Sequence, residues 1–285
     1  MPETYSAHES RLYYVEETAY GQTPTNPSML SVPAESLEPA ISPNNIKIRG
    51  VGNADLQAVK KGLREPSLKV TYPMPSDAPI NLLQYVRADL DKSLSVQVLY
   101  YKGAFVSASS IISLLYTGCR FQRLTVECSI EDVVKATAEL LAQDAASGTA
   151  KITGASYADH VGAVPFYESH VKKDTTTLER VTDWKFTIEN HLKQVPVIRA
   201  TNGAILKYLP YRHRDLTGEI TFEFESKDEF DDALGDTEFT LEFGLGSTNK
   251  AVLSGCKWEN LAAPTRIEEL VSVKTAFVAK NVAIS

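Results

Sequence analysis

An internal repeat with an offset of 137 residues limits the possible folds more than any other feature of this chain. Gly118-Cys119-Arg120-Phe121 reappears as Gly255-Cys256-Lys257-Trp258. Without gaps, the match extends from Gly118–Asp144 onto Gly255–Asn281 and contains seven identical pairs. Average composition gives about one or two identities by chance over such a length. A repeat of this length indicates two copies of one structural unit.

Two shorter matches precede this one in the same order along the chain. They pair Val70–Tyr72 with Ile220–Phe222 and Leu94–Val98 with Phe239–Phe243. Their offsets differ slightly from 137, as loops of unequal length would produce. The sequence therefore predicts four regions: an N-terminal arm at 1–35, a first domain at 36–144, a linker or intermolecular arm at 145–179, and a second domain at 180–285.

Within each copy, apolar and polar residues alternate with the period of half-buried strands. Trp184, Phe186 and Ile188 alternate with Lys185, Thr187 and Glu189, which predicts a strand. Ser129–Gln143 has a helical pattern as well. Its repeat partner, Leu270–Ala279, contains many β-branched residues, so we expect strands at both places.

Each copy is expected to contain one short helix. In the second copy, Ser226–Glu229 forms a capping-box pattern before Phe230 and Leu234, and Gly235 is the expected end of the helix. Ser76–Tyr85 lies at the matching place in the first copy. The fold class is mainly β, with two tandem sandwich or barrel domains that each carry a short flanking helix and a long hairpin.

Composition excludes several classes of protein. Of the 285 residues, 43% are hydrophobic and 23% are charged, as in packed rather than disordered chains. The net charge of −7 is unlike that of a protein that grips nucleic acid. The sequence contains neither a secretory signal nor a stretch suited to a membrane helix. Cys119, Cys128 and Cys256 fit buried free thiols made in a reducing cytoplasm.

The sequence offers no catalytic, metal-binding or cofactor-binding constellation. The five histidines lack metal-site spacing, and no nucleophile elbow or phosphate-binding loop is present. Asp159-His160 and His213-Arg214-Asp215 are more simply explained as surface loops than as catalytic sets. Cys119 and Cys256, each next to a glycine, are expected to be small core residues at a tight turn. We therefore predict a protein that is not an enzyme.

Two other segments are candidates for functional surfaces, one for a contact between subunits and one for an acidic face. The hairpin Leu94–Cys119, in which Lys102 is the one charged residue, is apolar enough to predict a contact between subunits, and the alternative is a strand buried in its own domain. Asp215–Glu242 holds eleven acidic residues and one lysine, which is typical of either a solvated face or a surface that repels phosphate. The candidate subunit-contact residues are Phe105, Val106, Ile111, Ile112, Leu114 and Leu115. The candidate acidic face consists of Glu219, Glu223 and Glu225.

Five phrases of the chain resemble the tail tube proteins of siphovirus-like bacterial and archaeal viruses. They lie at Tyr14–Pro24, Asn45–Gly50 with Asp55–Gln57, Phe186–Asn190, Leu216–Phe222 and Thr275–Ala279. The resemblance implies a virion structural protein whose stacked rings form a conduit for DNA ejection. Because such rings contain six domains and this chain has two copies, it implies three chains per ring, around a pseudo-sixfold axis.

The same resemblance implies the partners. They are further copies of the chain and the tail terminator, tape measure and baseplate proteins. Viral DNA would pass through without specific binding, and neither a membrane nor a cofactor would be involved. The expected place is the virion tail, assembled in the host cytoplasm. The alternative function is a two-domain tail terminator, an adaptor or another β-sandwich binding module. A tube protein polymerises by itself, whereas an adaptor stops at one ring.

Overall fold

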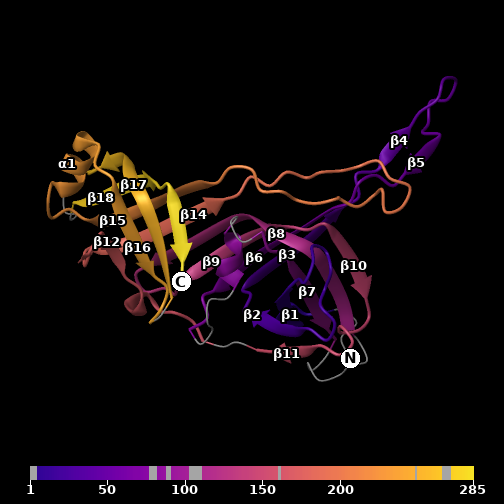
Figure 1. Cartoon of the computed structure of the whole chain (residues 1–285), viewed down its shortest axis with the longest axis horizontal. Helices are drawn as coiled ribbons and strands as arrows, with labels where there is room; N and C mark the ends of the chain where they lie inside the picture. The colour runs from indigo at the N-terminus through magenta and orange to yellow at the C-terminus, as the bar shows by residue number, and fades with distance from the viewer. Residues whose placement is uncertain are drawn as a thin grey trace.

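The chain is mainly β and forms two halves joined by one long sheet (Figure 1). The computed structural model describes residues 5–76, 82–87, 91–102, 111–159, 162–247, 249–264 and 271–285. This part contains one α-helix and three short 3₁₀ helices, none of them long and apolar enough to span a bilayer. The helices are α1 (Asp228–Gly235), η1 (Ala7–Glu9), η2 (Leu82–Val86) and η4 (Phe166–Glu168).

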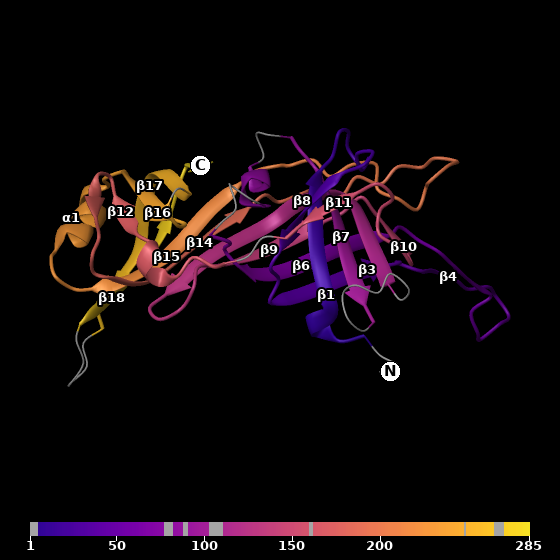
Figure 2. The ribbon, with the colours of Figure 1, turned by 90° about the horizontal axis from the view of Figure 1, so that it is seen from below.

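The joining sheet contains eight antiparallel strands, four from each half (Figure 2). We call it the long sheet. Each half contributes its strands in the same order, and the two sets meet where β8 pairs with β14. In order across the long sheet, the strands are β3 (Ser36–Ser42), β6 (Glu65–Pro73), β9 (Lys135–Leu141), β8 (Ile111–Ser129), β14 (Val181–Glu189), β15 (Asp215–Glu223), β18 (Ser272–Val278) and β17 (Lys250–Ala262).

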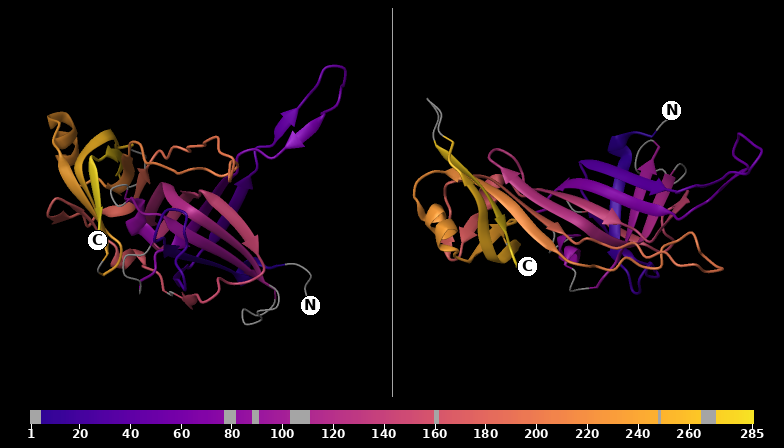
Figure 3. Two further views of the ribbon diagram at one scale, coloured as in Figure 1. Left: turned by 45° about the vertical axis from the view of Figure 1, so that its right-hand side comes forward. Right: turned by 90° about the horizontal axis from the view of Figure 1, so that it is seen from above.

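A second sheet packs over the long sheet in each half. In the N-terminal half it runs β11 (Ser156–Ala158), β2 (Ser28–Val32), β1 (Ser10–Glu16), β7 (Leu94–Tyr101), β8 and β10 (Asp144–Gly148). In the C-terminal half it runs β13 (Thr176–Thr177), β12 (Val171–Lys173), β16 (Phe239–Gly244), β17 and β19 (Asn281–Ile284). A separate hairpin of β4 (Ile46–Ile48) and β5 (Ala58–Lys60) projects from the body (Figure 3).

The two longest strands, β8 and β17, each belong to both layers of their half. The first part of each strand pairs in the second sheet and the last part pairs in the long sheet. The change occurs at Gly118 and Gly255, whose φ angles are 65° and 64°. Glycine adopts this left-handed conformation without the Cβ penalty. Each glycine lies in a bulge of a continuous strand, which corrects the expected tight turn.

The strands of the second sheets include segments that we expected outside the two domains. Residues 10–16 and 28–32, expected within an N-terminal arm, form β1 and β2. Leu12, Tyr13 and Tyr14 are all buried, so this run of apolar side chains is core rather than arm. Within the expected linker at 145–179, β11 pairs with β2 and β12 pairs with β16.

The alternation predicted for the strands matches the packing. Trp184, Phe186 and Ile188 are buried in a core cluster that extends through both halves, and the intervening residues face the other side. Ile220 and Phe222 are buried in the same way, but Phe224, beyond the end of β15, is 43% exposed. The strands expected within Ser129–Gln143 and Leu270–Ala279 are confirmed as β9 and β18.

The helix expectations are only partly correct. α1 begins at Asp228 with Lys227 as its N-cap residue, and no side chain caps it there. The predicted capping box is wrong because Glu229 turns inward and pairs with Arg180 instead. α1 ends at Gly235, as expected, and the next residue, Asp236, has the left-handed conformation. In the N-terminal half, the segment expected at Ser76–Tyr85 includes the start of η2, while residues 77–81 lie outside the described part.

Candidate assembly surfaces

The last part of β8 and the whole of β14 form the seam between the two halves. Seven residue pairs are in register, from Asp183 opposite Ser129 to Glu189 opposite Arg123. On the solvent side, Arg123 Nη2 donates to Glu189 Oε2 at 2.6 Å. The hydroxyls of Thr125 and Thr187 lie 3.0 Å apart. On the core side, apolar side chains from both strands interlock. The seam is thus a continuous part of one sheet.

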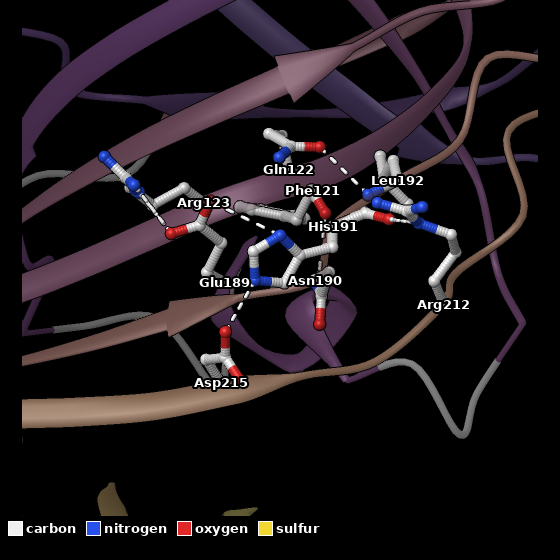
Figure 4. A network of polar contacts seen from close by, with 9 residues as sticks. All are labelled: Phe121, Gln122, Arg123, Glu189, Asn190, His191, Leu192, Arg212 and Asp215. Atoms are coloured by element: carbon white, nitrogen blue, oxygen red, sulfur yellow. Dashed lines mark hydrogen bonds and ion pairs between the residues drawn. The ribbon is translucent and has the colours of Figure 1, made fainter. Parts of the chain in front are cut away.

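Beside the seam, a polar network fixes the chain where it leaves β14 (Figure 4). Asn190 is fully buried, and its Nδ2 donates to the backbone oxygens of Phe121 at 3.1 Å and Val86 at 2.8 Å. The amide of Leu192 donates to Gln122 Oε1 at 3.0 Å. All three hydrogen bonds cross from the C-terminal half to the N-terminal half. They direct the following segment along the N-terminal half.

That segment, residues 190–214, is a long connector between β14 and β15 and lies on the N-terminal half (Figure 1). Leu206 and Leu209 are fully buried. Arg120 Nη1 donates to the backbone oxygen of Leu209 at 3.0 Å, and its guanidinium lies over the ring of Tyr211. Gln143 Nε2 donates to the oxygens of Leu206 and Lys207. We call this docked segment the C-terminal connector.

Arg120 and Gln143 both lie near the bulge at Gly118. The buried carboxylate of Glu17 stabilises this bulge. The Glu17 carboxylate is 8% exposed and accepts hydrogen bonds from the backbone amides of Gly118 and Gly21, each at 2.7 Å. It also accepts the hydroxyls of Ser93 at 2.5 Å and Ser95 at 2.8 Å. Glu17 lies within the family-like phrase Tyr14–Pro24, where nothing in the sequence distinguishes it from the adjacent Glu16, so no role was predicted for it.

The two ends of the long sheet are open within the described chain. β3 pairs with β6 on one side, and β17, along Lys257–Ala262, pairs with β18 on one side. Neither β3 nor this last part of β17 has a described strand on its other side. Ile41 of β3 is 44% exposed, and Leu261 of β17 is half-buried. Open strand edges present unpaired backbone groups and favour pairing with another chain.

One face of the long sheet is polar and carries an excess of acid. On β3, β6, β9, β14, β15, β18 and the Arg123–Ser129 part of β8, nine carboxylates and five cations occupy the register positions of this face. We call it the polar face. The acids are Glu38, Glu65, Glu127, Glu139, Asp183, Glu189, Asp215, Glu219 and Glu223. The cations are Lys69, Arg123, Lys135, Lys185 and Lys274.

Of the predicted acidic residues, Glu219 and Glu223 lie on the polar face and Glu225 lies beyond the end of β15. Glu219 is between two cations, with its carboxylate 3.2 Å from Lys274 Nζ and 3.4 Å from Lys185 Nζ. Their hydrogen bonds and charge lower the pKa of Glu219. Other members of the acidic run pair elsewhere, such as Asp232 with Lys173 and Asp236 with Lys257. Much of that run is therefore compensated by basic residues from other segments.

The predicted contact hairpin lies inside the second sheet of the N-terminal half. β7 has β1 on one side and β8 on the other, and the start of β8 is flanked by β7 and β10. Ile111 is buried, Leu114 and Leu115 are half-buried, and Ile112 is 38% exposed. Phe105 and Val106 lie outside the described residues.

The described residues contain one group with possible metal ligands, namely His191, His213 and Asp215. The two rings stack 4.0 Å apart, and His191 Nε2 already bonds Asp215 Oδ2 at 2.7 Å. Sequence reasoning noticed His213 and Asp215 but not His191, which comes from the other end of the connector.

The other polar and cysteine candidates from the sequence do not form a site in the described structure. Asp159 accepts a hydrogen bond from the hydroxyl of Tyr13, while His160 lies outside the described part. Burial raises the pKa of Cys119 and that of Cys256, the latter to about 12, which favours the thiol over the reactive thiolate at both positions.

A family model described as phage tail tube protein matches residues 7–279. The chain belongs to the phage tail tube protein family. Membership makes it a structural component of the virion tail, and the sequence-based recognition is confirmed. No curated protein matches the chain. Because tail tube proteins act by assembly, the seam, the open edges and the polar face are the candidate assembly surfaces of this family member.

Proposed function

We propose that this tail tube protein polymerises by extending its long sheet from one chain to the next. The contact between chains would repeat the strand pairing that the seam makes within a chain. The observation that carries the proposal is the match between the seam and the open edges. Within the chain, the fourth strand of one half (β8) pairs with the first strand of the other (β14). The fourth strand of the C-terminal half is β17 and the first strand of the N-terminal half is β3, and both edges are open in the described chain.

Strand direction is compatible with closure. All seven pairings across the long sheet are antiparallel, so β3 and β17 at its two ends run in opposite directions. The β3 strand of a second chain therefore meets β17 as an antiparallel neighbour without inversion of either chain. Repetition of the same contact closes a ring with cyclic symmetry.

The two halves are, in this proposal, two copies of one tube-type domain. Matching glycines with positive φ and matching strand orders support this reading. So does a pair of ion pairs at equivalent positions: Arg120 with Asp91 and Lys257 with Asp236, both at 2.6 Å. The equivalence includes the residues on which the C-terminal connector docks. A ring of three chains would then contain six domains around a pseudo-sixfold axis.

The size of such a ring fits a conduit. Three chains with eight strands each give a barrel of 24 strands. At about 4.8 Å between strands, the circumference is at least about 115 Å and the diameter about 37 Å, and strand tilt increases both. An eight-stranded barrel from one chain would be filled by its own side chains. In the larger barrel the covered apolar side faces outward and the polar face lines the lumen.

The polar face suits the passage of DNA. A lumen with more carboxylates than cations does not hold phosphates, whereas each unpaired lysine or arginine would bind them. We propose that viral DNA passes without specific binding and that Glu219 and Glu223 contribute to the lining. Ile112, exposed at the start of β8, is available for contacts between rings. The terminator, tape measure and baseplate proteins are the proposed partners, and assembly would occur in the host cytoplasm.

Negative-stain microscopy of the purified protein, with mass determination of its smallest ring, tests the proposal. We expect hollow tubes built from rings of three chains. Single rings that never stack would indicate an adaptor or terminator instead. A monomer that stays monomeric at high concentration, with no partner or trigger able to polymerise it, would overturn the proposal.

A further inference from the structure

Two long connectors occupy equivalent places in the two halves, but only one of them is covered. Residues 43–64 connect β3 to β6, and residues 190–214 connect β14 to β15. The second is the C-terminal connector, which docks on the N-terminal half. The first, which we call the N-terminal connector, contains the projecting hairpin of β4 and β5 (Figures 1 and 3).

The two connectors are related in sequence near their ends. With the offset of 150 residues that relates β6 to β15, Leu56 corresponds to Leu206, Val59 to Leu209, and Arg64 to Arg214. Leu206 and Leu209 are the two buried anchors of the C-terminal connector. Their counterparts are solvent-exposed, Leu56 at 37% and Val59 at 53%. The N-terminal connector thus carries the same anchors without a surface to cover them.

The surface that receives the anchors also has a counterpart. On the N-terminal half, Arg120 and Gln143 donate to the backbone oxygens of the C-terminal connector. With the repeat offset of 137, their counterparts are Lys257 and Lys280. Both remain hydrogen-bond donors. We call the surface around Lys257 and Lys280 the empty seat.

Exposure distinguishes the occupied seat from the empty one. The side chain of Arg120 is 8% exposed, because the C-terminal connector covers it, whereas that of Lys257 is 35% exposed. Each of these cations pairs with its own equivalent aspartate at 2.6 Å, so the two sites differ mainly in what lies above them. Lys280 is 60% exposed. Nearby, the buried indole Nε1 of Trp258 has no hydrogen-bond partner in the described structure.

We infer that the N-terminal connector of one chain docks on the empty seat of the neighbouring chain, with Leu56 and Val59 as its anchors. The inference rests on the proposed ring. In that ring, β3 of one chain pairs with β17 of the next, as β14 pairs with β8 in the seam. The start of the N-terminal connector then lies beside the empty seat, as the start of the C-terminal connector lies beside the surface on which it docks. The partner is therefore a second copy of this chain. Lys257 and Lys280 would donate to backbone oxygens of the connector.

Crosslinking between two single-substituted chains tests the contact directly. Val59→Cys and Lys257→Cys proteins are mixed before assembly and treated with a short bis-maleimide. We expect a two-chain product that neither variant gives alone. Val51→Cys is the matched control, since Val51 lies in the same hairpin, is fully exposed, and corresponds to the exposed Thr201 of the docked connector. It should give little product with Lys257→Cys. The native cysteines are buried and do not interfere.

A second measurement uses Leu56→Asp with Val59→Asp. Both side chains are exposed in the free chain, so the monomer should fold normally, while the polymerised fraction at a given concentration should fall at least tenfold. Val51→Asp should assemble as the unaltered protein does. Tubes that form without the crosslink, and a double variant that assembles normally, would overturn the inference and leave the proposed tube function standing. Failure of the unaltered protein to form rings would instead contradict the proposed function.

Discussion

Leu124 and Ile188 face each other across the seam between β8 and β14, and neither side chain is exposed to solvent. The repeat offset of 137 makes Leu261 of β17 the counterpart of Leu124. The strand register makes Ile41 of β3 the counterpart of Ile188, because Ile188 faces Leu216 and Ile41 faces Pro66, the residue that corresponds to Leu216 at the offset of 150. These counterparts lie at opposite ends of the long sheet of one chain. The same apolar pair that is buried within the chain is thus partly exposed at its open edges.

This relationship predicts opposite effects for two matched substitutions. Ile188→Ala should destabilise the folded monomer by about 2–4 kcal/mol, because it leaves a cavity in the seam. Ile41→Asp should leave the unfolding free energy of the monomer nearly unchanged and prevent ring formation, because a carboxylate would be buried between chains. Urea unfolding and analytical ultracentrifugation measure the two effects. Rings of normal stability from Ile41→Asp protein would contradict pairing between β3 and β17.

The buried carboxylate of Glu17 should be among the most sensitive positions of the N-terminal half. Glu17→Ala removes the acceptor of four hydrogen bonds, including the one from the amide of Gly118 in the bulge. The expected loss of unfolding free energy is about 2–4 kcal/mol. The adjacent Glu16→Ala is the matched control, since Glu16 is partly exposed and pairs with Lys92, and it should cost less than about 1 kcal/mol. Equal losses in urea unfolding would show that the four donors find other partners.

Acid should weaken the C-terminal half through Glu242. Hydrogen bonds from Lys250, Lys172 and His170 lower the pKa of Glu242 to about 2. Because its folded pKa is below the unfolded value of about 4.3, the group stabilises the fold above that value. This contribution, about 1–2 kcal/mol, is lost as the pH falls from about 4.5 to 2. Glu242→Gln should flatten the stability of the monomer over this window, as thermal unfolding at several pH values would measure. An unchanged pH profile would contradict this assignment.

The sequence predicted strands well where one face of a strand is buried and the other solvated. β14 and β15 alternate clearly for this reason, and the repeat made it possible to assign β9 and β18 against a helical pattern. β1 was missed because Leu12, Tyr13 and Tyr14 are buried in succession, between two layers of core, and so do not alternate. The capping at the start of α1 was predicted wrongly because Glu229 gains a buried ion pair with Arg180, which outweighs a local cap, whereas the end at Gly235 agrees with the expectation.

The assembly surfaces were harder to predict than the strands. The seam depends on pairing between β8 and β14, which local patterns do not encode. Apolar content favoured the hairpin at Leu94–Cys119 as a contact, and in its described parts, 94–102 and 111–119, many apolar side chains pack in the core of their own half. The exposed anchors Leu56 and Val59 lie in a short, mixed segment without a distinctive pattern. Only the comparison of the two connectors in space reveals them.

The last prediction concerns the charge of the lumen. The polar face of each chain has nine acids and five cations. If this face lines the tube, Glu219→Lys with Glu223→Lys changes its charge balance to seven acids and seven cations. It also leaves Lys185 and Lys274 without the carboxylate that now pairs with both. Phosphates passing the ring would then meet unpaired cations, and friction would add up over every ring of the tube.

We therefore expect assembled tubes of this variant to retain short duplex DNA, as measured by cosedimentation, and to release it as salt is raised. Tubes of the unaltered protein should retain little. Asp228→Lys with Asp231→Lys is the matched control, because it makes the same change of charge on α1, away from the polar face. Equal retention by the control would place DNA on the outer wall. The screening length of about 8 Å at physiological salt confines the effect to residues that face the duplex. A structure of the assembled tube with a pore lined by unpaired lysine and arginine would therefore refute the prediction of a negative lumen.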